Sequence, residues 1–201
     1  MEMLFDNYTL GLLLFAISMV ATPGPANMIL LSAGSQFGFK KSVPFVIGII
    51  LSKQIIIWPI GLGILTFFEL FPSFINIIKV ISCTYIIWLA WKLSRFKVSE
   101  DQKLTDAPSF FHGLPVHPTN PKAWAMVSVS FSNYTNPNES LISSTIVVAI
   151  IFIFVQLFFH NLWCFFGEQL KKKFQNTYYE ILLMRFLSLL MLSSLILLFY
   201  K

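Results

Sequence analysis

A Pro-Gly-Pro sequence at Pro23, Gly24 and Pro25 interrupts the first long apolar run of the chain, at about 8–36. That run exceeds the about 20 apolar residues that cross a bilayer as a helix. Each proline removes a backbone donor and glycine weakens a helix, so the helix is expected to break here. In lipid, broken backbone is tolerated where it faces protein or a wet cavity, and such breaks are typical of transport sites.

The chemistry expected at this break is the binding of an anion. Residues after Pro25 begin a new half-helix, whose first N–H groups lack intrahelical partners and whose positive dipole end faces the break. A carboxylate suits this position, and Asn27 can add a hydrogen bond to it. The alternative is a structural kink, in which Asn27 bonds neighbouring backbone.

Two lysines within apolar runs are further candidates. Lys53 lies about eleven residues, or roughly 16 Å, from the start of its run, near mid-membrane. A charge there costs at least about 2.5–3.5 kcal/mol, so such a lysine is usually functional. Lys122 lies either at a similar depth or, if Pro115 and Pro118 hold the chain at the interface, snorkels to the cytoplasm.

The predicted spans contain no aspartate or glutamate. Either burial leaves the lysines neutral, or an anionic ligand group supplies the missing charge. The absence argues against a carboxylate proton relay and leaves His160, one turn after Gln156, as the candidate for proton coupling. The alternative for His160 is a histidine bonded to a neighbouring helix. His112 and His117 are interpreted as interfacial.

The composition indicates an integral membrane protein. The 201 residues are 56% hydrophobic and 11% charged, against about 25% charged in soluble domains, and the mean hydropathy is +0.74. The basic residues are scattered among short loops, so membrane topology explains the net charge of +5 better than nucleic acid does. No zinc-type histidine pair or phosphate-binding glycine loop occurs, so no metal, cofactor or enzyme activity is expected.

The expected fold is all-α, with six transmembrane helices forming one domain over 1–201. The predicted spans are about 8–36, 43–68, 71–92, 110–134, 141–166 and 181–200. A polar linker at about 93–109 separates a first half, about 1–95, from a second half, about 110–201. Three spans per half predict two inverted repeats. Asn120, Pro121 and Lys122 would break helix four as Pro-Gly-Pro breaks helix one.

The basic loops predict the orientation of the chain. Lysines and arginines concentrate at 40–41, 92–103 and 171–173, whereas the other loops carry Glu69 and Glu139. Cytoplasmic loops are enriched in Lys and Arg, so both termini are expected outside the cytoplasm.

Four ordered motifs give the chain a resemblance to the LysE/RhtB family of amino-acid exporters. They are Thr22-Pro23-Gly24-Pro25-Ala26-Asn27, Gly38-Phe39-Lys40-Lys41-Ser42, Tyr85-Ile86-Ile87-Trp88-Leu89-Ala90-Trp91-Lys92 and Asn120-Pro121-Lys122-Ala123-Trp124. Tyr8-Thr9-Leu10 and Phe199-Tyr200 further resemble the branch that exports cysteine and O-acetylserine. The resemblance implies a small secondary carrier of the bacterial inner membrane, forming a homodimer and coupled to the proton gradient. Lys53, Pro115 and Pro118 depart from the family pattern.

The sequence therefore predicts an exporter of small amino acids that works by alternating access. Its site would lie at mid-membrane and be formed by Pro23, Gly24, Pro25, Asn27, Lys53, Asn120, Pro121 and Lys122. One alternative is a membrane protein of the same fold with a non-transport role, such as an integral enzyme or an assembly factor. A channel is the other alternative.

Overall fold

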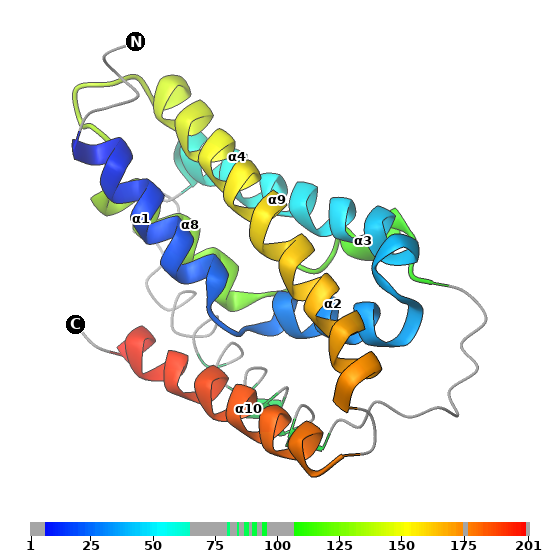
Figure 1. The fold of residues 1–201 in the computed structure, drawn as a ribbon. Helices are drawn as coiled ribbons and strands as arrows, with labels where there is room; N and C mark the ends of the chain where they lie inside the picture. The colour runs from blue at the N-terminus through cyan, green and yellow to red at the C-terminus, as the bar shows by residue number, and fades with distance from the viewer. Residues whose placement is uncertain are drawn as a thin grey trace.

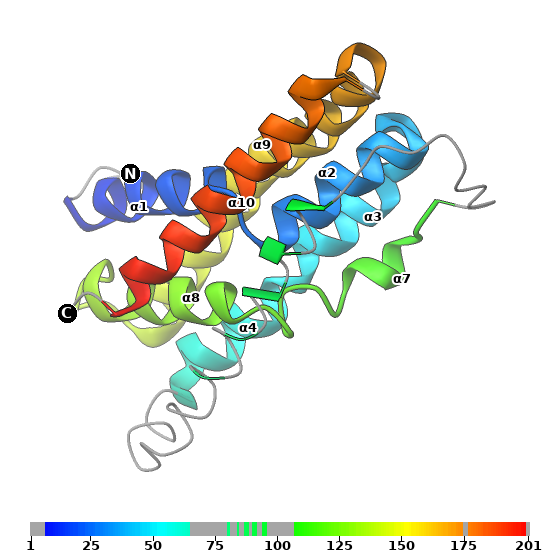
Figure 2. The ribbon, with the colours of Figure 1, turned by 90° about the horizontal axis from the view of Figure 1, so that it is seen from below.

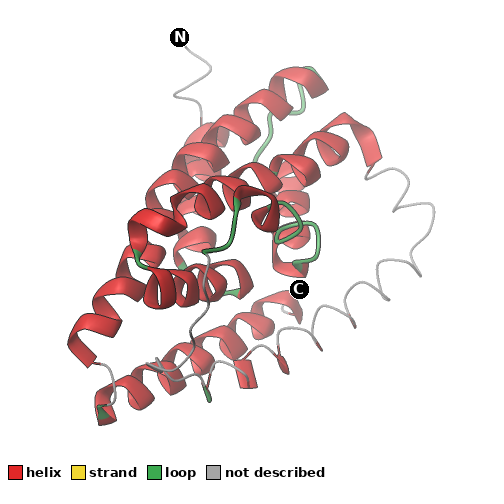
Figure 3. Cartoon of the chain, turned by 90° about the vertical axis from the view of Figure 1, so that its right-hand side faces the viewer, coloured by secondary structure: helices red, strands yellow, loops and turns green. Residues whose placement is uncertain are grey.

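A computed structural model describes residues 7–64, 80, 84, 87–88, 90–91, 94–95, 107–174 and 177–199. The regular structure in these ranges is helical throughout (Figures 1 and 3). The longest helix, α9 (Leu141–Phe174), contacts α1, α2, α3, α4, α8 and α10. The other long helix of the second half is α10 (Tyr178–Phe199). Most of the predicted span at 71–92 and of the linker at 93–109 lies outside the described residues.

The first predicted span is broken where Pro-Gly-Pro predicts the break. Helix α1 (Asn7–Ala21) and helix α2 (Pro25–Phe37) meet at a bend of 52° (Figure 2). Pro25 occupies the first turn of α2, where its missing N–H costs nothing and its fixed φ favours the helix. The break therefore ends one helix and starts another.

The second predicted span is one continuous apolar segment. It consists of α3 (Phe39–Ser52), α4 (Gln54–Pro59) and the π-helical turn η2 (Ile60–Ile64), and its stretch Phe39–Gly63 is long and apolar enough to cross a membrane. Helix α9 is also long and apolar enough to cross a membrane. The bent pair α1–α2 adds a third candidate if the two helices together form a single broken span. The described residues thus contain two or three candidate spans, and the full six-span arrangement stays a prediction.

Helix four is interrupted more extensively than the sequence suggested. The four-residue helix α7 (Phe110–Gly113) is followed by turns, and α8 (Pro121–Asn133) begins only after them. The predicted break in helix four therefore extends back from Asn120 over 114–120, because Pro115 and Pro118 each remove a backbone donor. Helix α7 lies against α3 so closely that a Cβ on Gly48 would come within 2.1 Å of the carbonyl oxygen of Phe110.

Two apolar clusters fill the bundle on either side of the breaks. The α1-side cluster consists of Leu12, Ala16, Val20, Ile56, Ile57, Ile60, Ala123, Met126, Val127, Val148, Ala149, Phe152 and Val155. The α2-side cluster consists of Ala26, Leu30, Ala33, Phe45, Val46, Ile49, Ile50 and Cys164. The two helix breaks lie between these clusters.

Two glycines allow α2 and α9 to approach closely. A Cβ on Gly34 would lie 1.8 Å from the carbonyl oxygen of Cys164, and a Cβ on Gly167 would lie 2.1 Å from that of Leu31. Small residues at such contacts let helix backbones pack directly in membranes. Since the obstruction in both cases is backbone, a larger side chain has no room unless the helices separate.

We therefore expect Gly34→Val and Gly167→Val each to destabilise the protein by about 1–3 kcal/mol, the usual cost of overpacking. The measurement is the thermal unfolding midpoint of the purified protein in detergent. Leu157→Val, at an exposed position of α9, is the matched control and is expected to leave the midpoint unchanged. Equal midpoints for all three variants would contradict the close packing.

Candidate functional site

The side chain of Lys122 joins the two helix breaks. Its Nζ donates to the hydroxyl Oγ1 of Thr22 at 2.8 Å, to the carbonyl oxygen of Pro23 at 3.2 Å and to that of Thr22 at 3.4 Å. The side chain is buried, because the chain before α8 runs inward along α3. The interpretation in which Lys122 snorkels to the cytoplasm is therefore wrong. Gly24 leaves room for this lysine, since a Cβ there would lie 3.1 Å from its Cδ.

The N-termini of the two half-helices differ in how they are capped. At α8, the N-cap Asn120 accepts a hydrogen bond from the Lys122 backbone N–H through Oδ1, at 3.1 Å. At α2, the N-cap is Gly24, and no side chain caps the helix. The positive end of α2 is therefore the one without its own side-chain acceptor, as an anion site requires.

Asn27 both holds the kink and leaves an acceptor open. Its Nδ2 donates to the carbonyl oxygens of Val20 and Thr22, each at 2.8 Å. Because both partners are acceptors, they assign the amide nitrogen to this side, as hydrogen-bond networks do for asparagine. The other atom, Oδ1, is buried without a hydrogen-bond partner. The structural-kink interpretation is thus confirmed for Nδ2, while Oδ1 stays open to a ligand.

Lys53 is buried completely at the junction of α3 and α4. Its Nζ lies 3.9 Å from the Met126 Sδ and 4.5 Å from the centre of the Phe152 ring. A thioether is a weak acceptor and an aromatic face attracts a cation only modestly. A carboxylate close to this amine would be a far stronger partner than either group.

Gln156 joins two buried histidines. Its Nε2 lies 2.8 Å from the His117 Nε2 and 2.9 Å from the His160 Nε2, and the two rings are stacked 5.7 Å apart. The backbone N–H of His117 also donates to the Ser52 hydroxyl at 3.3 Å. The interfacial interpretation of His117 is therefore wrong, whereas His112 is exposed. The signal for His117 was its position three residues before Asn120, in a segment that two prolines keep from being helical.

These residues surround one small cavity between the apolar clusters. It has about 20 Å³ of space for the centre of a water molecule, which is room for about one water. It is lined by Met19, Val20, Gly24, Ala26, Asn27, Lys53, His117, Asn120, Lys122, Met126 and His160. In the part of the chain that the structure describes, the buried side-chain polar atoms without partners are Asn27 Oδ1, His117 Nδ1, Gln156 Oε1 and His160 Nδ1.

Most of the predicted site residues meet at this cavity. Pro23 contributes its carbonyl oxygen to Lys122, and Pro25 and Pro121 start the two half-helices. Gln156 lies behind the histidines and bonds both. Among the described residues, no carboxylate lines the cavity, and no group of three or more metal-ligating side chains occurs. The arrangement is a polar pocket lined by two lysines in an apolar bundle, as expected of a small-ligand site.

A family model described as LysE type translocator matches residues 17–201. The chain belongs to the LysE type translocator family. Among curated proteins, a cysteine/O-acetylserine efflux protein of Escherichia coli O1:K1 / APEC is 23% identical over 155 residues, covering 77% of this translocator and 80% of that relative. The protein of the same name from Salmonella choleraesuis (strain SC-B67) is 22% identical over the same lengths. No solved structure matches the translocator.

The family match favours a transport role for the chain over the integral-enzyme and assembly-factor alternatives. The resemblance derived from the sequence motifs is thereby confirmed at the level of the family. The translocator is a membrane protein with apolar helices arranged around a buried polar site.

Proposed function

We propose that this chain is a secondary transporter that exports small amino acids from the bacterial cytoplasm. The observation that carries the proposal is the cavity at the paired breaks. Its described lining combines two buried lysines with an uncapped helix N-terminus and contains no carboxylate. An amino-acid carboxylate supplies the charge that this site lacks. The names of the relatives favour cysteine or O-acetylserine as the substrate, with threonine and homoserine as further candidates.

Each end of a bound amino acid has a partner in this proposal. The carboxylate lies at the N-terminus of α2 and takes hydrogen bonds from Lys122 and Lys53. The ammonium group donates to the Oδ1 of Asn27, which is buried and lacks a donor. Because the cavity holds about one water, these side chains must move apart when substrate enters.

Alternating access would proceed by rocking of two inverted three-helix halves within the single domain 1–201. In support, α2 and α8 each have 13 residues and each begin with proline after a break. The cavity lies between two apolar clusters, and opening one while the other stays closed would expose the site to one side at a time. The coupling proton is assigned to His160 with Gln156, and His117 is their partner across the cavity.

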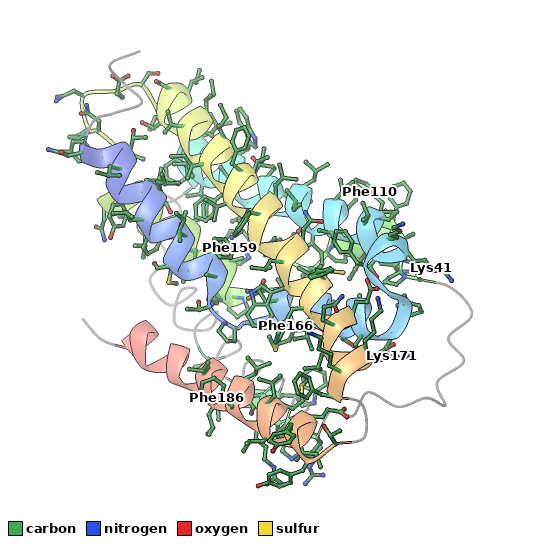
Figure 4. All side chains as sticks on the ribbon, viewed as in Figure 1. Lys41, Phe110, Phe159, Phe166, Lys171 and Phe186 are labelled. Atoms are coloured by element: carbon green, nitrogen blue, oxygen red, sulfur yellow. The ribbon has the colours of Figure 1, made fainter. Side chains whose placement is uncertain are left out.

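The proposed orientation places both termini outside the cytoplasm. In support, the start of α3 meets the end of α9, where the backbone N–H of Phe39 donates to Glu168 at 2.8 Å. Lys41 and Lys171 lie at these helix ends (Figure 4), and cytoplasmic loops are enriched in such residues. The opposite end of α9 then faces the outside.

Efflux from proteoliposomes tests the proposed function. Purified protein is reconstituted into liposomes preloaded with labelled cysteine, O-acetylserine, threonine, homoserine or lysine, and a proton gradient is imposed. We expect saturable efflux of one or more small amino acids above protein-free liposomes, with acceleration by unlabelled substrate on the far side. Absence of efflux for all five would contradict the proposal, and efflux without saturation or counterflow would indicate a channel.

A further inference from the structure

A second pocket lies at the end of the bundle where α1 and α9 begin. The start of α1 lines it with Tyr8 and Leu12, the turn after α8 with Thr135 and Glu139, and the start of α9 with Ser144. It has about 30 Å³ of space for the centres of water molecules. Most of its lining side chains are polar, although α1 and α9 are mainly apolar helices. The proposed orientation places this pocket on the outer side.

This pocket and the cavity at the helix breaks, here called the midplane cavity, are both lined by residues of α1, of α9 and of α8 or its C-terminal turn. Leu12 lines the outer pocket and Val20 lines the cavity, and both belong to the α1-side cluster. Their separation of eight positions along helix α1 corresponds to about 12 Å. On the facing helix, Met126 lines the cavity and the C-cap Tyr134 lines the pocket. The α1-side cluster therefore lies between the outer pocket and the midplane cavity, along the direction of helix α1.

An aromatic pair lies beside the outer pocket, because one of its members, Tyr134, lines that pocket. The rings of Phe15 and Tyr134 stack with centroids 4.9 Å apart. Gly11 allows this approach, because a Cβ there would lie 3.1 Å from a ring carbon of Tyr134. Movement of α1 relative to α8 would separate the two rings and open a passage from the midplane cavity to the outer pocket.

The two sites have opposite electrostatic character. Among the described residues, the midplane cavity is lined by Lys53 and Lys122 and by no carboxylate, whereas the outer pocket is lined by Glu139 and by no lysine or arginine. In the midplane cavity, the lysines bind the carboxylate of the amino acid. In the outer pocket, Glu139 attracts its ammonium group. The same Glu139 repels the substrate carboxylate, which favours onward release.

We propose that the outer pocket is an exit site, in which the exported amino acid is held by its ammonium group at Glu139 after passing the Phe15–Tyr134 pair. This inference rests on the proposed function, because the occupant of the exit site is the exported substrate. Hydroxyl groups of Thr135 and Ser144 supply further hydrogen-bonding groups in the lining.

Substrate protection of an introduced cysteine tests the exit site. Ser144→Cys is made with the two native cysteines replaced by serine, and intact cells are treated with a membrane-impermeant maleimide. External O-acetylserine, which has no thiol, is expected to slow the labelling of Ser144→Cys at least about threefold. The matched control is Asn138→Cys, at an exposed position of the same turn outside the pocket, whose labelling rate is expected to stay constant. Adding Glu139→Gln is expected to raise the half-protecting concentration at least about threefold.

Efflux of O-acetylserine by the Ser144→Cys protein is measured in parallel. Efflux without protection, or labelling that occurs only from the cytoplasmic side, would overturn the exit site and leave the proposed function standing. Equal slowing at both cysteines would also overturn it, because the effect would not be local to the pocket. Absence of O-acetylserine efflux in the wild type would show that O-acetylserine is not a substrate, and the exit site proposed for it would be overturned as well.

Discussion

Replacement of Lys122 by methionine is expected to lower the initial rate of amino-acid efflux about 100-fold. The variant removes the positive charge that faces the substrate carboxylate, and a buried charged hydrogen bond of this kind is worth about 2–5 kcal/mol. It also removes the donor that joins the two breaks through Thr22 and Pro23. The measurement is the initial efflux rate from proteoliposomes at equal amounts of reconstituted protein.

The same variant is expected to lower the thermal unfolding midpoint, because buried acceptors lose their donor. Lys172→Met is the matched control, since that lysine is exposed and its ion pair is with Glu168 on its own helix. We expect the control to retain both the wild-type rate and the wild-type midpoint. A Lys122→Met rate within twofold of the wild type would remove Lys122 from the proposed site.

Replacement of Lys53 by leucine is expected to abolish efflux while leaving membrane insertion and folding intact. The side chain lies against Met126 and Phe152, which are partners that a leucine also suits. Since no carboxylate lines the described cavity, removal of this amine leaves no unpaired counter-ion, and a leucine avoids the cost of burying a polar group. We therefore expect an unfolding midpoint equal to or above that of the wild type, in contrast to Lys122→Met.

The measurement for Lys53→Leu combines efflux, the membrane-inserted amount and the unfolding midpoint of one preparation. The matched control is Lys41→Leu, at the exposed start of the same span, which is expected to transport at the wild-type rate. Wild-type efflux by Lys53→Leu would exclude a role in substrate binding. A fall in the midpoint together with the loss of efflux would instead assign Lys53 a structural role.

Local chemistry made the main features of the site predictable from the sequence. Pro23, Gly24 and Pro25 remove donors and helix propensity from one short stretch, so the break follows from these residues alone. Asn120 before Pro121 is likewise a local N-cap signal, which the structure confirms. Because a charge at mid-membrane is costly, Lys53 could be predicted as a site residue without any knowledge of its neighbours.

Long-range packing decided what the sequence left open. The depth of Lys122 depends on how α7 lies against α3 at Gly48, and no local pattern gives that contact. His117 was misplaced for the same reason, because its burial requires the turns after α7 to run inward. The structure shows that the Asn27 Nδ2 donates to the carbonyl oxygens of Val20 and Thr22, and only these contacts separate its role in the kink from the open Oδ1.

If the paired breaks recognise an amino-acid carboxylate, a compound that lacks this group must compete poorly with the substrate. Cysteine and cysteamine share a thiol and an amine and differ by the carboxylate. Their inhibition of labelled O-acetylserine counterflow is measured in proteoliposomes held under reducing conditions. We predict inhibition by cysteine and at least about 100-fold weaker inhibition by cysteamine, the same loss that is expected from replacing Lys122 on the protein side. Equal inhibition by the two compounds would contradict it.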